Sequence, residues 1–328
     1  MRGIAAATTG GPEVLRLRND LAVPAPGAGE VRIRVAWSGL VPVDVLARAG
    51  RLDFLVVPSP FIPGLEYTGV VDALGPGTDA AWFGSRVLAR RGFGGCAEYA
   101  VAKVGALVNL DPRIDLCVGA AYRGAAMTAW FLVNIAARVQ SGDTVLVHSG
   151  AGPVGLMLTQ IARDRGARVV ALAGGPAKLD FARAYGADVL IDYLRDDWPD
   201  AVREATAGHG ADIVFDGNGG PQGVRNYTVT APLGQIFWIG ANAGSLTPYP
   251  GAAELIARNL RIGGFTLGAI EHLHREQAEQ EIIEAIVAGR WRVPIGRRAT
   301  LAEVPQLHAD FEARRLMGRT VIELSGEL

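Results

Sequence analysis

Three glycines near the middle of the chain have the spacing of a phosphate-binding loop. The pattern is G-x-G-x-x-G, and it occupies the run Val145–Gly155 with its glycines at Gly150, Gly152 and Gly155. The second glycine lets the backbone approach a pyrophosphate, while free N–H groups at the start of the next helix face the anion. Because an apolar strand precedes the motif and an apolar helix follows it, we predict a dinucleotide site. A tight strand-to-helix turn and an S-adenosylmethionine site are the alternatives.

The end of the next apolar strand bears on which dinucleotide binds. NAD sites place an acidic residue there, which binds the ribose 2′-hydroxyl. This chain has Gly174 and Gly175 after the strand and then Lys178, with no acid between them. A lysine attracts a 2′-phosphate and an acid repels it, so we predict that NADPH is preferred over NADH. The alternative is that Lys178 is an ordinary solvated helix residue.

The elements around this loop alternate between strand and helix. Apolar strands are predicted at 144–148, 168–173, 189–191, 212–215 and 235–239, and helices are predicted at 119–137, 153–165 and 178–185. Such alternation favours a parallel, doubly wound sheet of the Rossmann type. Pro153 and Val154 then lie in the first turn of the helix after the loop, where a proline is tolerated.

The first third of the chain is instead rich in short strands between glycine and proline turns. Val31–Val35 alternates apolar and polar residues with period two, as a half-buried strand does. After about residue 265 the strand–helix alternation stops, and Glu271–Gly289 is predicted as an amphipathic helix. Arg319–Leu324 is a last strand, which we expect to return to the first domain because a lone strand needs a sheet.

Composition excludes several classes of function. The chain has 328 residues, of which 49% are hydrophobic, and a formal charge of -1. A chain with this charge lacks the excess of positive charge that binding to nucleic acid or to an acidic membrane surface requires. Two cysteines, Cys96 and Cys117, cannot form a disulfide framework or a four-cysteine zinc site. We expect a cytoplasmic protein with neither a nucleic-acid nor a membrane partner, because no signal sequence and no long apolar run is evident.

Further motifs resemble the zinc-independent quinone oxidoreductases of the medium-chain dehydrogenase/reductase superfamily. They extend over essentially the whole chain, at Gly39–Asp44, Pro60–Val71, Gly94–Tyr99, Thr128–Trp130, the glycine loop, Ala211–Gly220 and Gly234–Gly240. The resemblance implies an α/β fold: a Rossmann domain at 123–265, inserted in a discontinuous, mainly β, GroES-like catalytic domain at 1–122 and 266–328. It also implies NADPH as the hydride donor, a homodimer, and quinones, enones or enoyl thioesters as substrates.

The resemblance also implies which residues hold the cofactor. With Gly150 from the loop, and with Gly174 and Asn218, the predicted set is Thr128, Gly150, Gly152, Pro153, Val154, Gly174, Lys178, Tyr193, Asn218, Gly240, Ala241, Phe265, Leu267 and Arg314. Lys178, Tyr193 and Arg314 would lie near the 2′-phosphate. Tyr193 has an alternative role in packing, and Arg314 has one as a solvated arginine.

Zinc is not expected in this chain. The zinc-dependent relatives have a cysteine, a histidine and a further cysteine or acid where this chain has Val41, Leu65 and Gly124, none of which is a zinc ligand. His148, at the end of a strand, is predicted to be a hydrogen-bonded structural residue.

Two positions make the predicted pocket of this chain less polar than that of many family members. Those members have asparagine where this chain has Val41 and tyrosine where it has Leu46. This difference puts quinone reduction as the physiological role in doubt.

Candidates for direct chemistry follow from the same segments. Asp44, Tyr67 and Tyr122 are considered as proton donors, although the tyrosines have an alternative role in packing and Asp44 one in capping a helix. Glu66 is expected to be buried and structural. Apolar side chains are predicted to form the substrate pocket, at Leu40, Val41, Leu46, Phe54 and Phe61, with Phe265 nearby.

The sequence therefore predicts an NADPH-dependent, zinc-free oxidoreductase that acts on a hydrophobic quinone or enone. The cofactor supplies the hydride, and the protein supplies orientation and an apolar enclosure. Two other functions remain open at this stage. One is a stand-alone enoyl reductase of a biosynthetic pathway, and the other is a non-catalytic NADPH-binding protein.

Overall fold

The alternating segment Val31–Val35 lies inside β3 (Glu30–Gly39) of the computed structural model, which describes residues 1–52, 57–90, 92–240, 247–248 and 250–325. Val31, Ile33 and Val35 are fully buried, whereas Arg34 is exposed. The period-two pattern thus places one face of β3 in a core, as predicted.

The chain divides into two compact units, and each is described by itself. Unit 1 comprises Met1–Gly124 and Val293–Leu328, and unit 2 comprises Ala125–Arg292. In this division the helix α8 (Leu267–Val287) belongs to unit 2, whereas the sequence prediction begins the second catalytic segment at residue 266. The functional domain boundaries stay a prediction.

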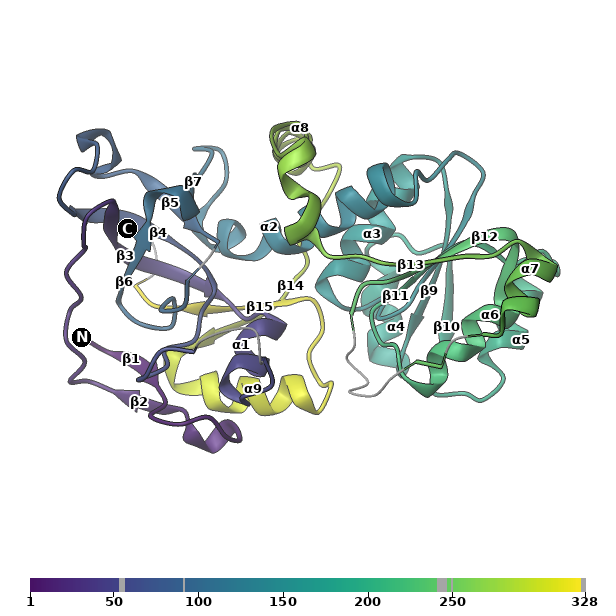
Figure 1. Ribbon diagram of the computed structural model, residues 1–328, viewed down its shortest axis with the longest axis horizontal. Coiled ribbons are helices and arrows are strands. Elements are labelled where there is room, and N and C mark those ends of the chain that lie inside the picture. The colour runs from purple at the N-terminus through teal and green to yellow at the C-terminus, as the bar shows by residue number, and fades with distance from the viewer. Residues whose placement is uncertain (53–56, 91, 241–246, 249, 326–328) are drawn as a thin grey trace. The chain divides into compact units, whose positions relative to one another are not determined.

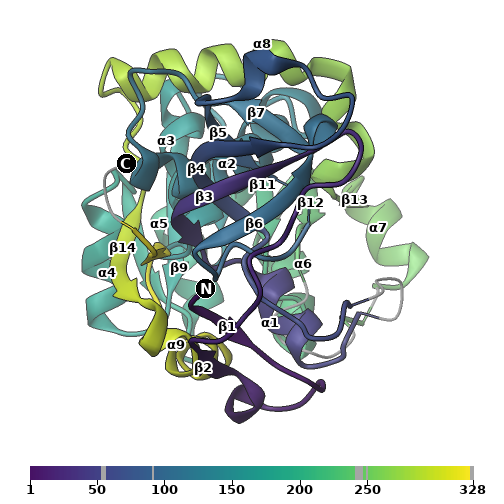
Figure 2. The ribbon, with the colours of Figure 1, turned by 90° about the vertical axis from the view of Figure 1, so that its left-hand side faces the viewer.

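Unit 1 is built on a mainly antiparallel sheet with the order β14-β15-β3-β4-β5-β7, to which β6 adds by pairing with β3 (Figure 2). Its other strands are β4 (Glu66–Leu74), β5 (Arg86–Ala89), β6 (Tyr99–Lys103), β7 (Leu107–Asn109), β14 (Ile295–Thr300) and β15 (Arg319–Glu323). A small pair, β1 (Gly3–Ala5) and β2 (Arg16–Arg18), and the helices α1 (Pro42–Arg48) and α9 (Val304–Glu312) complete the unit.

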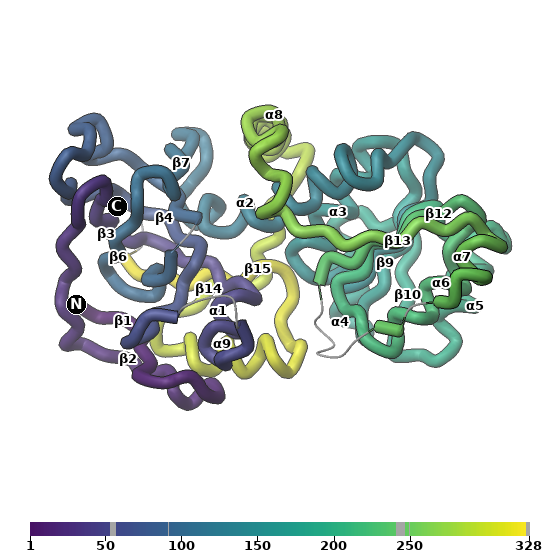
Figure 3. Tube along the Cα trace, viewed as in Figure 1, coloured from purple at the N-terminus to yellow at the C-terminus, as the bar shows by residue number. Residues whose placement is uncertain are grey.

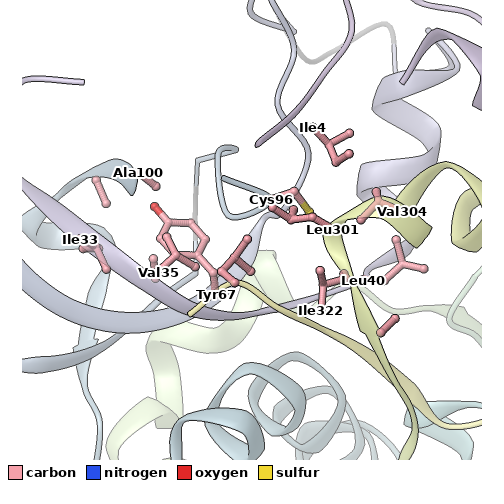
Figure 4. Close-up of a cluster of buried hydrophobic side chains, with 14 of the residues drawn as sticks. Ile4, Ile33, Val35, Leu40, Tyr67, Cys96, Ala100, Leu301, Val304 and Ile322 are labelled. Carbon is pink, nitrogen blue, oxygen red and sulfur yellow. The ribbon is translucent and has the colours of Figure 1, made fainter. Parts of the chain in front are cut away.

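The last strand of unit 1 comes from the far end of the sequence. β15 pairs antiparallel with β3, with Ile322 opposite Ser38, so that segments nearly 300 residues apart lie side by side (Figure 3). This confirms the prediction that Arg319–Leu324 returns to the first domain. Side chains of β3, β4, β15 and α9 meet in one buried cluster, in which Tyr67 lies close to Val35 (Figure 4).

Unit 2 contains the predicted parallel sheet, with the order β10-β9-β8-β11-β12-β13. Its strands are β8 (Thr144–Val147), β9 (Arg168–Ala173), β10 (Val189–Asp192), β11 (Ala211–Asp216), β12 (Thr230–Trp238) and β13 (Arg261–Gly264). Its helices α3 (Pro153–Asp164) and α4 (Pro176–Arg183) lie on one side of the sheet, and α5 (Trp198–Ala205), α6 (Asn226–Val229) and α7 (Ala252–Arg258) lie on the other (Figure 1). The strand order reverses between β8 and β11, and such a switch point is where open sheets of this kind bind ligands.

A long apolar helix connects the two units. It comprises α2 (Leu116–Phe131) and a π-helical continuation, Leu132–Ala136. By length and composition this helix could cross a membrane, but 83% of its most apolar window is buried inside the protein. That burial is typical of a core helix.

The resemblance to the quinone oxidoreductases implies a homodimer that pairs through a sheet edge at the strand 235–239. This edge position is wrong, because β12 is flanked by β11 and β13. Within the part of the chain that the structure describes, β13 is the edge strand on that side. Exposed edges invite pairing with another chain, so the predicted homodimer would use β13.

His308 makes unit 1 sensitive to acid. Burial, and then the Arg48 guanidinium, lower the pKa of His308 to about 3 from an ordinary value of 6.5. The unfolded chain therefore binds a proton between pH 6.5 and 3 that the folded chain does not, and stability falls as the pH falls through this interval. We expect His308→Leu to remove this contribution, so that between pH 7 and pH 4 the variant gains about 3 kcal/mol of stability relative to the wild type. Urea unfolding at pH 7 and pH 4 tests this, and the same change of stability with pH in both proteins contradicts it.

Candidate active site

The glycine loop joins β8 to α3 in the geometry that the motif requires. Gly152 precedes the first residue of α3, Pro153, and its N–H donates to the Ser149 carbonyl at 2.8 Å. A Cβ atom at position 155 would clash with that same carbonyl oxygen, so only glycine lets the helix approach the loop this closely. Val154, also in the first turn, is half-buried. The N-terminal end of α3 thus presents free N–H groups beside the loop.

The predicted 2′-phosphate region lies one strand away, at the end of β9. Gly174 follows β9 directly, and a Cβ atom there would lie 3.1 Å from the Tyr193 hydroxyl, so the phenol ring covers this glycine. Lys178 lies in the first turn of α4 and is half-buried. The structure therefore brings Gly174, Lys178 and Tyr193 to the carboxyl ends of β9 and β10.

Other predicted cofactor residues lie at several places in the fold. Thr128 is half-buried in α2, Gly240 is exposed after β12, and the Phe265 N–H donates to the Trp238 carbonyl at 2.9 Å. Leu267 is the first residue of α8. Arg314 belongs to unit 1, where it is exposed after α9 with a φ of 54°. Ala241 lies outside the described residues.

Asp44 is a buried carboxyl group that binds backbone from two segments. Its Oδ1 accepts the N–H groups of Gly64 and Leu65 at 2.9 and 3.1 Å, and its Oδ2 accepts that of Val41 at 3.1 Å. Burial raises the pKa of Asp44 to about 7, against the lowering effect of these three bonds. The bonds tie the start of α1 to the turn before β4. Asp44 therefore holds the predicted pocket residues Leu40 and Val41 in place.

The two tyrosines considered as proton donors are both inside unit 1. Tyr67 is fully buried in the cluster of Figure 4, and its hydroxyl has no hydrogen-bond partner among the described residues. Burial raises the pKa of this phenol well above its usual value. Tyr122 is 2% exposed in α2. A proton donor must reach the substrate, so these positions favour the alternative role in packing, and direct chemistry by either tyrosine stays a prediction.

The predicted pocket residues are apolar and mostly buried. Leu40, Val41 and Phe61 are less than 9% exposed, and Leu46 is half-buried on α1. Phe61 packs edge-on against Phe93, with ring centroids 4.9 Å apart. Phe54, the other predicted wall residue, lies outside the described residues.

Arg319 and Glu66 form a buried ion pair whose partner the sequence does not predict. Arg319 Nη2 lies 3.4 Å from Glu66 Oε2, and the same guanidinium donates to the carbonyls of Leu40 and Ala121 at 3.0 and 3.3 Å. A Cβ atom at Gly124 would overlap Glu66 Oε1. Glu66 is buried and structural, as expected, and its side chain fills the space that a ligand side chain at position 124 would need. Among the residues described, no three or more His, Cys, Asp or Glu side chains gather as a metal site would require.

A second polar cluster lies at the carboxyl ends of β8 and β11. His148 Nε2 lies 2.6 Å from Asn226 Oδ1, which confirms the expectation of a hydrogen-bonded histidine. Asn226 in turn contacts Asp216, and Ser149 contacts Asn218. The sequence places Asn218 in the cofactor set but does not indicate these partners, because they lie about 70 residues apart in the chain.

Comparisons with known proteins find relatives over almost the whole chain. Residues 27–112 match the family described as alcohol dehydrogenase GroES-like domain, and residues 153–287 match the one described as zinc-binding dehydrogenase. A quinone oxidoreductase of Pseudomonas aeruginosa is 31% identical over 96% of this chain and 97% of its own length. Two solved structures also superpose: a mycobacterial protein complexed with NADPH (32% identity, TM-score 0.87, 99% of this chain and 100% of that one) and an NAD-dependent alcohol dehydrogenase (31%, 0.85, 99% and 100%).

Proposed function

Because this chain belongs to the quinone oxidoreductase family of the medium-chain dehydrogenase/reductase superfamily and is an oxidoreductase, we propose that it transfers a hydride from NADPH to a quinone or an α,β-unsaturated carbonyl compound. The observation that carries this proposal is the end of β9. Gly174 follows the strand where an NAD site has an acid, and Lys178 and Tyr193 stand beside it. The mycobacterial relative with NADPH supports the same cofactor.

We propose that the reaction needs no zinc. The relatives that bind zinc supply ligands where this chain has Val41, Leu65 and Gly124, whose side chains cannot coordinate a metal. The Glu66 carboxylate lies beside Gly124, and it already pairs with Arg319 at 3.4 Å. The Arg319 guanidinium is thus the positive charge beside Glu66, and its hydrogen bonds to the Leu40 and Ala121 carbonyls join Leu40 to α2.

The roles of the chain's own residues follow from their positions. The free N–H groups at the start of α3 would bind the pyrophosphate, and Lys178 would bind the 2′-phosphate. NADPH, when bound, supplies a hydride from its nicotinamide ring. The side chains of Leu40, Val41 and Phe61 would enclose a hydrophobic acceptor and exclude water. Reduction also takes up one proton, for which Asp44, Tyr67 and Tyr122 are the candidates beside solvent.

NADPH consumption with a panel of quinones and enones tests this function. We expect faster oxidation with a hydrophobic enone than without an acceptor. Activity with an enoyl thioester alone would indicate the enoyl reductase instead. Tight NADPH binding with no turnover on any member would contradict the enzyme and favour a non-catalytic NADPH-binding protein.

Lys178→Glu tests the cofactor assignment. The substitution replaces a charge-assisted contact with a repulsive one, so we expect NADPH to bind at least about tenfold more weakly. Binding of NADH, which lacks the 2′-phosphate, should change by less than about threefold. Calorimetric titration of both cofactors gives the two values. An equal loss for NADPH and NADH would mean that Lys178 does not contact the 2′-phosphate.

We further propose a cytoplasmic homodimer that pairs through β13. The support is the position of β13 at the sheet edge among the described strands, with Arg261 and Gly264 exposed. A monomeric mass in solution would contradict this assembly.

A further inference from the structure

Five polar residues of unit 2 form a closed circuit, which we call the polar ring: His148, Ser149, Asp216, Asn218 and Asn226. His148 Nε2 meets Asn226 Oδ1 at 2.6 Å, and Asn226 Nδ2 donates to Asp216 Oδ2 at 2.9 Å. Asp216 Oδ1 accepts the Asn218 backbone N–H at 2.8 Å, and Ser149 Oγ donates to Asn218 Oδ1 at 2.8 Å. The peptide bond between His148 and Ser149 closes the circuit.

The carboxylate of Asp216 sets the direction of these hydrogen bonds. A carboxylate accepts and does not donate, so the Asn226 amide must turn its NH₂ group toward Asp216. The Asn226 carbonyl then faces His148, whose Nε2 must carry the hydrogen. Asp216, Asn226 and His148 are 1%, 0% and 6% exposed. Such a buried and fully paired network holds one geometry, because any other orientation leaves a polar group unpaired.

The polar ring lies where the sheet order reverses. His148 and Ser149 directly follow β8, and Asp216 is the last residue of β11, the neighbouring strand. The glycine loop continues from Ser149, and the 2′-phosphate region lies on the other side of β8, at β9. A dinucleotide with its adenosine end at β9 and its pyrophosphate at β8 must extend its second half over β11. Asn218 stands at the end of β11.

Asn218 is the member of the polar ring whose side chain keeps unused hydrogen-bonding capacity. Asn218 and Ser149 are half-buried, whereas His148, Asp216 and Asn226 are buried, and the Ser149 hydroxyl already donates inside the circuit. The ring engages its backbone N–H and its side-chain carbonyl, and no described residue accepts from its side-chain NH₂ group. The two N–H donors of this amide therefore have no acceptor among the described residues at the switch point.

We propose that the polar ring holds Asn218 so that its side-chain NH₂ group binds the nicotinamide-ribose half of NADPH. Asn218 is then a cofactor-contacting residue, and Ser149, Asp216, Asn226 and His148 are positioning residues that act through it. The proposal rests on the proposed function, because it requires that NADPH is the ligand. It adds which half of the cofactor is bound and by which group.

Asn218→Ala separates this contact from a general effect on the site. We expect NADPH to bind about tenfold more weakly, whereas adenosine 2′,5′-bisphosphate, which lacks the nicotinamide half, binds within twofold of wild type. Calorimetry on the purified full chain measures both. Equal losses for the two ligands would show a merely structural role, and unchanged NADPH binding would show no contact; either outcome overturns the proposal. A wild-type protein that binds neither ligand would instead refute the proposed function.

Ser149→Ala tests whether a positioning residue acts through Asn218. Alone, it should weaken NADPH binding about threefold, because the Asn218 amide loses the hydroxyl that orients it. In the Asn218→Ala background it should have no further effect, since the group it positions is gone. If the losses of NADPH affinity in the two single variants instead add up in the double variant, Ser149 does not act through Asn218 and the proposal is wrong.

Asn134→Ala is the matched control. Asn134 also makes two side-chain hydrogen bonds in unit 2, donating to the Trp130 carbonyl and accepting from Arg165 Nε at 2.8 Å each. It lies beside Arg165, at the C-terminal end of α3, away from the glycine loop. We expect a lower melting temperature with unchanged affinity for both ligands. A loss of NADPH affinity in this variant as large as that of Asn218→Ala would mean that destabilisation alone explains the result.

Discussion

Asp44→Ala is expected to lower the free energy of unfolding by about 3 kcal/mol, because it leaves the backbone N–H groups of Val41, Gly64 and Leu65 without their acceptor. Each such buried group costs about 1–3 kcal/mol, and part of that sum is offset because the buried carboxyl group is itself unfavourable. The variant should also lose activity, since the segment that carries Leu40 and Val41 is no longer held. Urea unfolding near pH 6 measures the loss of stability.

Asp79→Ala is the matched control for this substitution. Asp79 also accepts a backbone N–H, that of Ala81 at 2.9 Å, but at an exposed turn. Water replaces the lost acceptor there, so we expect a loss of at most about 1 kcal/mol. If the two variants unfold at the same urea concentration, Asp44 does not have the role assigned to it.

The pH dependence of Asp44 has the opposite sign to that of His308. The pKa of Asp44 is about 7 in the folded chain and 3.8 as its ordinary value, so the folded chain keeps a proton that the unfolded chain releases between these values. Its stabilising contribution is therefore fully present below pH 3.8 and is lost as the pH rises toward 7. Between about pH 4 and 6.5 the two groups offset each other. As the pH falls through this range, we expect His308→Leu to gain stability relative to the wild type and Asp44→Ala to lose stability relative to it, as measured by urea unfolding.

Gly155→Val is expected to weaken NADPH binding by on the order of 100-fold. The new side chain would collide with the Ser149 carbonyl and approach Gly150 Cα, which are backbone atoms that cannot turn away. The helix α3 must then move from the loop, which takes its free N–H groups away from the pyrophosphate and strains the packing by about 1–3 kcal/mol. Calorimetric titration with NADPH measures this.

Gly251→Ala is the control for this prediction. Gly251 precedes α7 in the same unit, has no positive φ, and a Cβ atom there would meet nothing within 4 Å. We expect unchanged NADPH binding. Wild-type affinity in Gly155→Val would show that the pyrophosphate does not bind at this loop.

The parts of the fold that the sequence predicted are those with local signals. The G-x-G-x-x-G spacing, the alternation in Val31–Val35 and the strand–helix rhythm each depend on neighbours within a few residues. The return of β15 was predicted by a different argument, that a lone strand needs a partner. Element ends differed by a few residues: α8 begins at Leu267 rather than Glu271, because nothing near residue 267 marks a helix start clearly.

The contacts that shape the site were out of reach because they are long-range. Glu66 and Arg319 are about 250 residues apart in the sequence. Position 124 must be glycine because the Glu66 side chain, which belongs to β4, fills the space beside it. Asp44 is a second example. A carboxylate in a matched motif suggests chemistry, yet three backbone N–H groups from two segments surround it. The partners of an acid decide its role, and only the folded chain brings them together.

The pairing of β15 with β3 has a consequence for synthesis on the ribosome. Chains emerge from the N-terminus at about 5–20 residues per second, and domains fold as units. Unit 2 is continuous, so all its strands are available while β15 is still untranslated. β3 lacks its β15 neighbour until the segment Arg319–Glu323 leaves the exit tunnel. The nucleotide-binding half therefore matures first, and the half with Asp44 waits with an open strand edge, which is where a nascent chain of this protein is most exposed to aggregation or chaperone capture.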